Sequence, residues 1–425
     1  MVMTISGDDR RVDRGVGSDA RPADPIAEFY DEHSYPPPVS DLDRYRDLWS
    51  TEDRRKVDHY LHWSAWPYRE DVSVLVAGCG TSQAAKVAIR RPASRVVGID
   101  ISATSLRHSA ALKARYRLEN LELYELPIEE VAVLGRSFDL ILCTGVLHHL
   151  LDPAAGLRAL RAVLEPHGAL HLMVYGRYGR LGIQMLQDYC RRLGVGRSEE
   201  SIDDLLHTLG ALPRSHPLEH LLSAPDFGRA DAVADALLNP RDRDYTVSEV
   251  FDLLDGAEMD FGRWTYQAQY LPQCGAVAST PHAARLRALP VREQFAAVEL
   301  LRGTIARHSL IAYGRHMSAD QKRIGFDSAA WPSYVPLRLP STIVIRERQP
   351  PGAAAVLLNQ AHTYPDLILP VDATELRMVE ATDGRRSIGA IAKFTGADAE
   401  CARSLFERLW WYDQMVFDTS GAASA

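Results

Sequence analysis

The chain has 425 residues, of which 46% are hydrophobic and 24% are charged, and its formal net charge is −8. This length exceeds that of a usual single domain, so we expect either one large domain with an insertion or two domains. The acidic balance gives no overall basic surface for nucleic acid, and no apolar run is long enough to cross a bilayer. We therefore expect neither a nucleic-acid partner nor a membrane span.

Residues 1–24 mix both charge signs and lack the apolar core of a secretory signal, which predicts a disordered tail. We expect a cytoplasmic protein, with signal-independent export as the alternative. The five cysteines, Cys79, Cys143, Cys190, Cys274 and Cys401, are odd in number and widely spread. Because this spacing fits neither a disulfide framework nor a zinc site, we expect reduced thiols and no metal.

Residues 25–70 are rich in aromatic residues and proline, and we call them the N-terminal collar. Three consecutive prolines at 36–38 exclude a helix there, whereas residues 53–63 have helical spacing. An aromatic wall can exclude water and hold a cationic acceptor group. The collar residues that could line such a channel are Tyr30, Tyr35, Trp63 and Trp66, and core packing is the alternative explanation for each of them.

Between residues 71 and 176 the sequence alternates between buried-strand runs and helix-like stretches. The strand runs are 72–78, 94–100, 121–126, 138–145 and 169–176, and the helix-like stretches include 103–118 and 153–164. This alternation predicts an α/β fold, a Rossmann-like parallel sheet covered by helices on both faces. Ligands of such sheets bind at the carboxyl ends of the strands.

The first strand run leads into "VLVAGCGT", in which Gly78 and Gly80 let the backbone come close to a ligand. The next run, "VVGID", ends at Asp100, whose carboxylate can accept hydrogen bonds from the two vicinal hydroxyls of a ribose. Together these residues predict a nucleoside site. A tight strand-to-helix turn and a helix N-cap are the structural alternatives for the glycines and for Asp100.

This pattern resembles the first motif of class I S-adenosylmethionine-dependent methyltransferases, and the likeness continues through "GVLHHL" at 145–150 to residue 176. The resemblance implies that residues 71–176 bind S-adenosylmethionine, with the adenine beside 126–128 and the methionine portion beside 143–145. The implied cofactor contacts are Ala77, Gly78, Cys79, Gly80, Asp100, Ile101, Leu126, Pro127, Ile128, Cys143, Thr144 and Gly145. The chain departs from the family pattern at three positions: Val76 replaces an acid, Ser82 replaces a third glycine, and Glu129 is the candidate substitute for an adenine-binding acid.

Methyl transfer from a sulfonium needs alignment and a dry site more than a dedicated acid and base, so the sequence indicates the cofactor better than the acceptor. His148 and His149 follow the fourth strand run, and Tyr175 ends the fifth. These three are the catalytic candidates, the histidines as proton acceptors. Tyr178 is a further candidate for the acceptor channel. Packing inside the fold is the alternative role for each.

Residues 177–330 are predicted to form a helical insertion and the end of the methyltransferase domain, with helices near 181–194, 201–212 and 230–239. Arg177 and Arg180 could clamp an acidic substrate or pair with acids. We expect "NPRDRDY" at 239–245 to precede a helix and assign no chemistry to it. The remaining predicted segments are a linker at 331–341, a small α+β winged-helix-like module at 342–419 and a frayed tail at 420–425.

Three hypotheses for the function follow. The first is a methyltransferase acting on a lysine of a basic protein such as a histone, suggested by the acidic chain, the appended segments and a resemblance of the whole chain to an actinobacterial, including mycobacterial, group in which protein-lysine methylation occurs. The second is a small-molecule O-, N- or C-methyltransferase, and the third is a non-catalytic scaffold. A closed pocket lined by the collar would favour a small acceptor, whereas a wide acidic groove would favour a protein tail. A homodimer formed through the insertion or the C-terminal module is expected.

Overall fold

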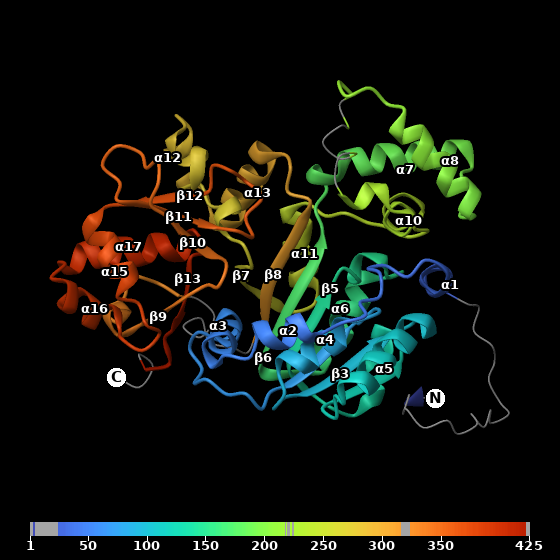
Figure 1. Cartoon of the computed structure of the whole chain (residues 1–425), viewed down its shortest axis with the longest axis horizontal. Coiled ribbons are helices and arrows are strands. Elements are labelled where there is room, and N and C mark those ends of the chain that lie inside the picture. Colours follow the sequence, from blue (N-terminus) through green and yellow to red (C-terminus); the bar gives the residue numbers. More distant parts are fainter. Residues whose placement is uncertain are drawn as a thin grey trace.

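The computed structural model describes residues 3–4, 24–216, 218, 222, 225–315 and 324–421. Eight strands form the central sheet: β1 Met3–Thr4, β2 Ser73–Ala77, β3 Arg95–Asp100, β4 Leu121–Glu125, β5 Phe138–Thr144, β6 Leu164–Tyr175, β7 Met259–Trp264 and β8 Arg307–Gly314. Their order is β1-β4-β3-β2-β5-β6-β8-β7 (Figure 1). Strands β2 to β6 pair in parallel, and β1, β7 and β8 add antiparallel pairs. The predicted Rossmann-like α/β fold is confirmed.

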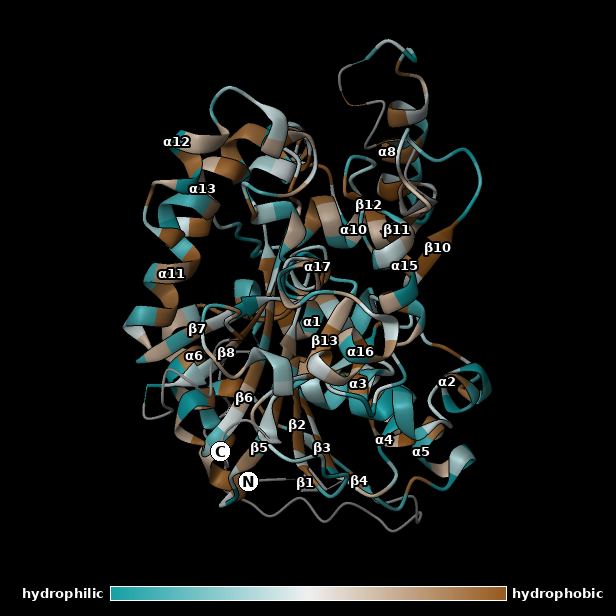
Figure 2. Ribbon diagram, turned by 90° about the vertical axis from the view of Figure 1, so that its left-hand side faces the viewer, coloured by the Kyte–Doolittle hydropathy of each residue, from teal (hydrophilic) through white to brown (hydrophobic). Residues whose placement is uncertain are grey.

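The strands of the parallel sheet are hydrophobic on both faces because helices cover both (Figure 2). In β2, Val74 and Val76 pack on one side of the sheet against α4 (Gln83–Arg90) and α5 (Ala103–Tyr116). Leu75 and Ala77 pack on the other side against α6 (Pro153–Ala162) and α11 (Val247–Gly256). Each of the strand runs predicted from the sequence forms a strand of this sheet.

The order of the sheet reverses between β2 and β5. From β2 the chain passes to β3 and then β4 on one side, and it returns to place β5 on the other side of β2. At such a switch point the loops that follow the two central strands diverge, which leaves a crevice at their carboxyl ends. The glycine turn after β2 and the 145–150 turn after β5 therefore face each other.

The collar contains α1 (Pro25–Glu32), α2 (Asp43–Leu48) and α3 (Glu52–His62). Helix α1 lies between the sheet domain and the helical insertion (Figure 1). Its Phe29 is buried against Ile202 and Ala234 of the insertion. On the other side, Asp31 accepts a hydrogen bond from Ser102 Oγ, at 2.6 Å, at the start of α5. Helix α1 therefore contacts both halves of the domain.

The helical insertion consists of α7 (Leu181–Leu193), α8 (Glu199–Gly210), η4 (Pro225–Gly228) and α10 (Ala230–Leu238), which share a core of their own. The predicted helix after 239–245 is α11, where Thr246 and Glu249 form a capping box. Shorter elements complete the domain: η1 Ile128–Leu134, η2 Leu147–His149, η3 Tyr178–Arg180, η5 Ala268–Tyr270, η6 Gly275–Ser279, α12 Ala283–Arg287 and α13 Val291–Arg302.

The C-terminal module has two small antiparallel sheets and three helices. The elements are η7 Trp331–Ser333, β9 Val335–Arg338, β10 Thr342–Ile345, β11 Ala355–Asn359, β12 Ile368–Val371, α15 Ala373–Glu380, α16 Ile388–Thr395, α17 Ala399–Trp411 and β13 Met415–Asp418. Strands β10, β11 and β12 form one sheet, and β9 pairs with β13. Residues 331–341 are thus not a linker: they supply β9, where Pro336 is tolerated because each strand of a two-stranded sheet is an edge.

The fully buried Asp413, in the turn between α17 and β13, fastens the module to the sheet domain. Its carboxylate accepts hydrogen bonds from Arg263 Nη2 at 2.9 Å and from the Ala268 amide at 3.0 Å. His362 Nε2 lies 3.1 Å from the same carboxylate. The Arg263 guanidinium also stacks over the Trp410 ring at 4.0 Å. One carboxylate therefore joins β7, the start of η5 and the module.

At the chain ends, Met3 and Thr4 of the predicted tail pair with the edge strand β4, whereas residues 1–2, 5–23 and 422–425 lie outside the described residues. All five cysteines are unpaired. Within the described residues, no helix has the length and apolarity needed to span a membrane.

Candidate functional site

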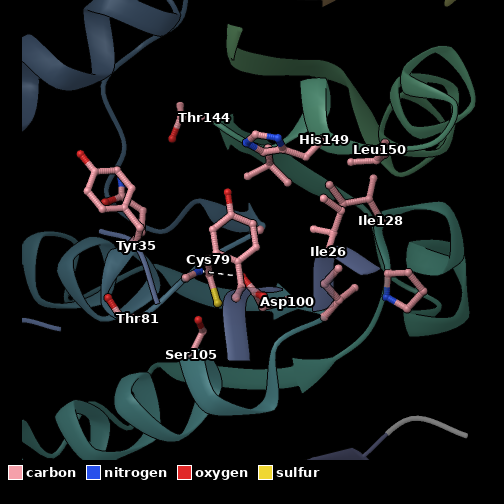
Figure 3. A pocket seen from close by; sticks show the side chains of 18 of the residues that line it. Ile26, Tyr35, Cys79, Thr81, Asp100, Ser105, Ile128, Thr144, His149 and Leu150 are labelled. Atoms are coloured by element: carbon pink, nitrogen blue, oxygen red, sulfur yellow. Dashed lines mark hydrogen bonds between the residues drawn. The ribbon is translucent and has the colours of Figure 1, made fainter. Parts of the chain in front are cut away.

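A cavity of about 330 Å³ lies at the switch point, at the carboxyl ends of β2, β3 and β5 (Figure 3). The sheet side of its lining comprises Gly78, Cys79, Gly80, Thr81, Ser82, Gln83, Lys86, Asp100, Ile101, Ser105, Leu126, Pro127, Ile128, Glu129, Thr144, Gly145, Val146, His149, Leu150, Leu151 and Met173. The collar and the segment before α11 contribute Asp24, Ile26, Tyr30, Tyr35, Pro36 and Arg241. Three chain segments that are distant in sequence thus enclose one pocket.

The two glycines of the turn after β2 are required for different reasons. Both have positive φ, +68° at Gly78 and +53° at Gly80, which favours glycine. A Cβ on Gly78 would lie 2.3 Å from Cγ2 of Val146, so the packing of Val146 leaves no room for a side chain at residue 78. A Cβ on Gly80 would meet no atom within 4 Å, because it would point into open space at the pocket. Gly80 is therefore where a missing side chain makes room for a ligand.

Asp100 holds this turn in place. One carboxylate oxygen accepts a hydrogen bond from the Gly80 amide at 2.7 Å, and the other accepts one from the Ser102 amide at 2.9 Å. Burial raises the pKa of Asp100, although these amide hydrogen bonds act in the opposite direction. The N-cap of α5 is Ser102, whose Oγ accepts from the Ser105 amide, so capping does not account for Asp100. Each carboxylate oxygen keeps a lone pair that a ligand hydroxyl can use.

All the predicted cofactor residues except Ala77 and Cys143 line this pocket. Those two side chains are buried in the hydrophobic core on the α6 and α11 face of the sheet. Their positions in β2 and β5 turn them away from the cavity, since successive strand residues point to opposite faces. Glu129 also lines the pocket, close to the residues predicted to flank adenine.

Of the predicted acceptor-channel residues, Tyr30 and Tyr35 line the pocket and Trp63, Trp66 and Tyr178 do not. Trp63 is buried in the core and donates its indole hydrogen to the His167 carbonyl at 3.1 Å, and Trp66 packs against the same core. Tyr178 lies in η3, beyond the end of β6. The core-packing alternative is therefore correct for the two tryptophans.

The Tyr30 hydroxyl is held by the insertion. It donates a hydrogen bond to Asp235 Oδ1 at 2.8 Å and accepts one from Asn239 Nδ2 at 3.3 Å. Burial and the nearby Asp235 carboxylate raise the pKa of Tyr30 well above its usual value. A neutral, fixed phenol at this position forms a wall of the pocket and does not act as a base.

The two histidines of the 145–150 turn differ in their access to the pocket. His149 lines the pocket, and its Nδ1 lies 2.7 Å from the Arg241 carbonyl oxygen. Because a carbonyl oxygen only accepts, Nδ1 is the nitrogen that carries a hydrogen in this contact. His148 is fully buried, and its ring lies 4.1 Å from that of Tyr175. Burial, followed by His149 and Arg180, lowers the pKa of His148 well below 6.5, which makes it a weak base.

Tyr175 and the two predicted arginine clamps lie outside the pocket lining. Burial raises the pKa of Tyr175, and the Arg180 guanidinium lies 3.6 Å over its ring. Arg180 pairs with Asp242 at 2.7 Å, and Arg177 pairs with Asp244 at 2.9 Å. Both arginines form ion pairs with acids of the chain, which was the alternative to clamping an acidic substrate.

The pocket residues that the sequence analysis missed fall into two groups. Thr81, Ser82, Gln83, Lys86 and Ser105 directly follow the predicted motif residues, so their proximity in sequence was a usable signal. Val146 and Leu150 belong to the 145–150 motif, whereas Asp24, Ile26, Pro36, Leu151, Met173 and Arg241 carried no local signal, because tertiary packing brings them to the cavity. Arg241 lies in the stretch to which no chemistry was assigned, and its Nη2 is 3.4 Å from Asp24 Oδ1.

Comparison with known proteins agrees with this site. A family model described as "Methyltransferase domain" matches residues 75–170. An uncharacterised protein of Synechococcus sp. is 29% identical over 242 residues, covering 54% of this chain and 57% of its own length. The ubiquinone biosynthesis O-methyltransferase of Acinetobacter baylyi is 26% identical over 152 residues, covering 36% of this chain and 58% of its own length. The chain thus spans little more than half the length of these relatives.

Among solved structures, PKMT2 from Rickettsia typhi covers 87% of this chain and 76% of its own length, with 15% identity and a TM-score of 0.62. The same protein in complex with AdoHcy gives 14% identity and a TM-score of 0.58, covering 87% of this chain and 75% of that one. At this identity the likeness shows the fold, and it extends over most of the chain, beyond the segment matched by the family model.

Proposed function

From the methyltransferase domain at residues 75–170 we propose that the chain is an S-adenosylmethionine-dependent methyltransferase. The observation that carries this proposal is the pocket at the switch point, where Asp100 accepts from the Gly80 amide and Gly80 faces open space. A scaffold would have no need to keep an open cavity beside these residues, so this geometry favours the enzyme over the non-catalytic hypothesis.

The residues present fit this cofactor. Asp100 can receive the ribose hydroxyls, and Leu126, Pro127 and Ile128 offer an apolar edge for adenine. Thr144 and Gly145 line the part of the pocket that we assign to the methionine portion. Bound there, S-adenosylmethionine supplies a methyl group carried on a positively charged sulfur. The chain contributes the alignment and the exclusion of water that such a transfer needs.

We assign the acceptor to the end of the pocket that the collar and Arg241 line. Tyr30 and Tyr35 reach the cavity from the collar, and the hydrogen bonds of Tyr30 to the insertion hold it there. Aromatic side chains at this end support a small-molecule acceptor, and the printed names of the O-methyltransferase relatives agree with that choice. The lysine of a basic protein is the second candidate acceptor, supported by the acidic chain and by the appended C-terminal module.

The test is calorimetric titration of the protein with S-adenosylmethionine and S-adenosylhomocysteine, followed by transfer of labelled methyl groups to a metabolite extract and to pooled basic proteins. We expect binding of both nucleosides and label in a small molecule. Label in protein alone would instead support the lysine acceptor. Absence of nucleoside binding by the folded chain would refute the proposed function.

Replacing Asp100 by alanine should weaken S-adenosylmethionine binding by about 1–3 kcal/mol, because the variant loses hydrogen bonds to a charged acceptor. It also leaves the Gly80 amide without its partner. Calorimetry measures the loss. The matched control is Asp152→Ala, which removes an acid that accepts the Ala155 amide at 2.9 Å in the N-cap of α6, outside the pocket lining. Equal affinity in the Asp100 and Asp152 variants would contradict the ribose assignment.

The raised pKa of Asp100 also gives this contact a pH dependence. The carboxylate, and not the protonated acid, accepts all of these hydrogen bonds, so affinity should fall as the pH is lowered through the raised pKa. The same pH series on Asp100→Ala should lack this component. A wild-type decline that persists unchanged in the variant would assign it to another group.

A further inference from the structure

Three side chains able to bind a metal meet behind the acceptor end of the pocket. His148 and His149 come from η2 after β5, and Asp242 comes from the segment between α10 and α11. One ligand atom of each lies within 4.8 Å of the others. Each of these side chains is at least nine-tenths buried, and His149 is the member that also lines the pocket.

Three polar atoms of this cluster lack the hydrogen bonds that burial requires. Neither ring nitrogen of His148 has a partner within the described parts of the chain, and neither has Oδ1 of Asp242. A buried polar group without a partner costs about 1–3 kcal/mol, so folded proteins contain few of them. Orphan atoms of two different residues within reach of each other point to a shared ligand.

Other polar atoms of the cluster are, by contrast, hydrogen-bonded. Nδ1 of His149 lies 2.7 Å from the Arg241 carbonyl oxygen and 3.9 Å from Oδ1 of Asp242. Oδ2 of Asp242 accepts from Arg180 at 2.7 Å and from Gln187 at 3.0 Å. Metal-binding histidines and carboxylates are usually oriented by outer hydrogen bonds of this kind.

We propose that His148, His149 and Asp242 form a site for one divalent transition-metal ion beside the acceptor end of the pocket. Two imidazoles and one carboxylate suit Zn²⁺, Co²⁺ or Fe²⁺ better than Mg²⁺, which prefers oxygen ligands. Three protein ligands leave at least one coordination position open. A second carboxylate, that of Asp235, lies close enough to interact electrostatically with His149, Asp242 and Arg180.

The proposed site differs from the expectation of no metal drawn from the cysteines. Residue spacing does not predict it, because Asp242 reaches the histidines only through the fold. The proposal goes beyond methyl transfer and does not depend on it: metal binding and nucleoside binding are measured separately, so either can fail while the other holds.

The test uses the full chain, purified without a polyhistidine tag, stripped with a chelator and titrated with Co²⁺. We expect one ion per chain with weak visible absorption bands and no thiolate charge-transfer band, since the ligands are nitrogen and oxygen. Zn²⁺ should displace the cobalt and raise the thermal unfolding temperature. Substoichiometric cobalt, or a thiolate band, would overturn the proposal.

Asp242→Asn and His148→Gln should each weaken Co²⁺ binding by more than about 100-fold, because loss of an outer hydrogen bond alone costs 10–100-fold. The matched control is His167→Gln, which disrupts a histidine–aspartate pair on the sheet, 2.7 Å from Asp139, and should bind as the wild type does. Circular dichroism and S-adenosylmethionine titration check the fold of each variant. If His148→Gln does not fold, the test rests on Asp242→Asn. Wild-type Co²⁺ affinity in Asp242→Asn would refute the site.

Discussion

Replacing Gly80 by leucine should abolish S-adenosylmethionine binding while the protein remains folded. The added side chain would point into the pocket, where no atom lies within 4 Å of its Cβ, and it would occupy space that the cofactor needs. The positive φ of +53° adds a backbone cost of about 1–2 kcal/mol, which a domain of this size can absorb. Calorimetry would measure the binding, and circular dichroism would measure the fold.

Two other glycines supply the comparison. Gly135 has a φ of +61° and open space at its Cβ, but it lies at the end of η1 outside the pocket lining, so Gly135→Leu should cost similar stability and keep the cofactor. Gly78→Leu should instead destabilise the whole domain, because its Cβ would collide with Val146. If Gly80→Leu binds the cofactor like the Gly135 variant, the cavity at the switch point is not the cofactor site.

Replacing Asp413 by alanine should lower the free energy of unfolding by about 3–5 kcal/mol, because removing one partner of a buried ion pair leaves the other charge uncompensated. Arg263 would then be a buried cation without its carboxylate, and the Ala268 amide would lose its acceptor. Denaturant unfolding followed by tryptophan fluorescence would measure the loss, since Trp410 stacks on Arg263.

Two variants make this prediction specific. Glu400→Ala removes an exposed acid that pairs with Arg403 on the surface of α17, and it should change stability by less than about 1 kcal/mol. The double variant Arg263→Met with Asp413→Ala removes both charges and should recover much of the loss. A double variant as unstable as Asp413→Ala would mean that the buried charge is not the cause.

Much of the sheet domain could be predicted because its signals are local. Parallel strands that are buried on both faces appear as continuous hydrophobic runs, and the runs from 72–78 to 169–176 each became a strand. The most informative part of the site is also short: Gly78, Gly80 and Asp100 lie within one strand-helix-strand unit. Their geometry follows from the order of elements in that unit, so residue spacing alone predicted a nucleoside pocket.

The rest of the site depends on contacts between distant segments. The side chains of Ala77 and Cys143 lie outside the pocket lining because a motif names a stretch of strand, whereas alternation decides which of its side chains face the cavity. Trp63, Trp66, Tyr30 and Tyr35 are all aromatic residues of the collar, so the sequence does not distinguish them. Only the packing of the fold places the tryptophans in the core and the tyrosines at the pocket. Arg241 and Asp242 had no sequence signal, since the fold alone brings them to His149.

One prediction about the C-terminal part of the chain was also missed because it depends on a distant contact. The prolines of residues 331–341 predict a linker, but β9 is defined by its pairing with β13, the last strand of the module. Local composition does not reveal a partner so far along the chain. The mixed α+β content of residues 342–419 could be predicted because helix periodicity needs no distant partner.

The pairing of β9 with β13 also sets the order in which parts of the chain can fold during synthesis on the ribosome. The central sheet has all its strands once β8 has emerged, whereas β9 must wait for Met415–Asp418. The same segment returns to the collar, where Tyr60 donates to Asp418 at 2.7 Å and the Thr419 amide donates to the Ser64 carbonyl at 2.7 Å. Translation that stops before β13 would therefore release a chain whose central sheet is complete, but in which β9 is unpaired and Tyr60 and Ser64 lack their partners.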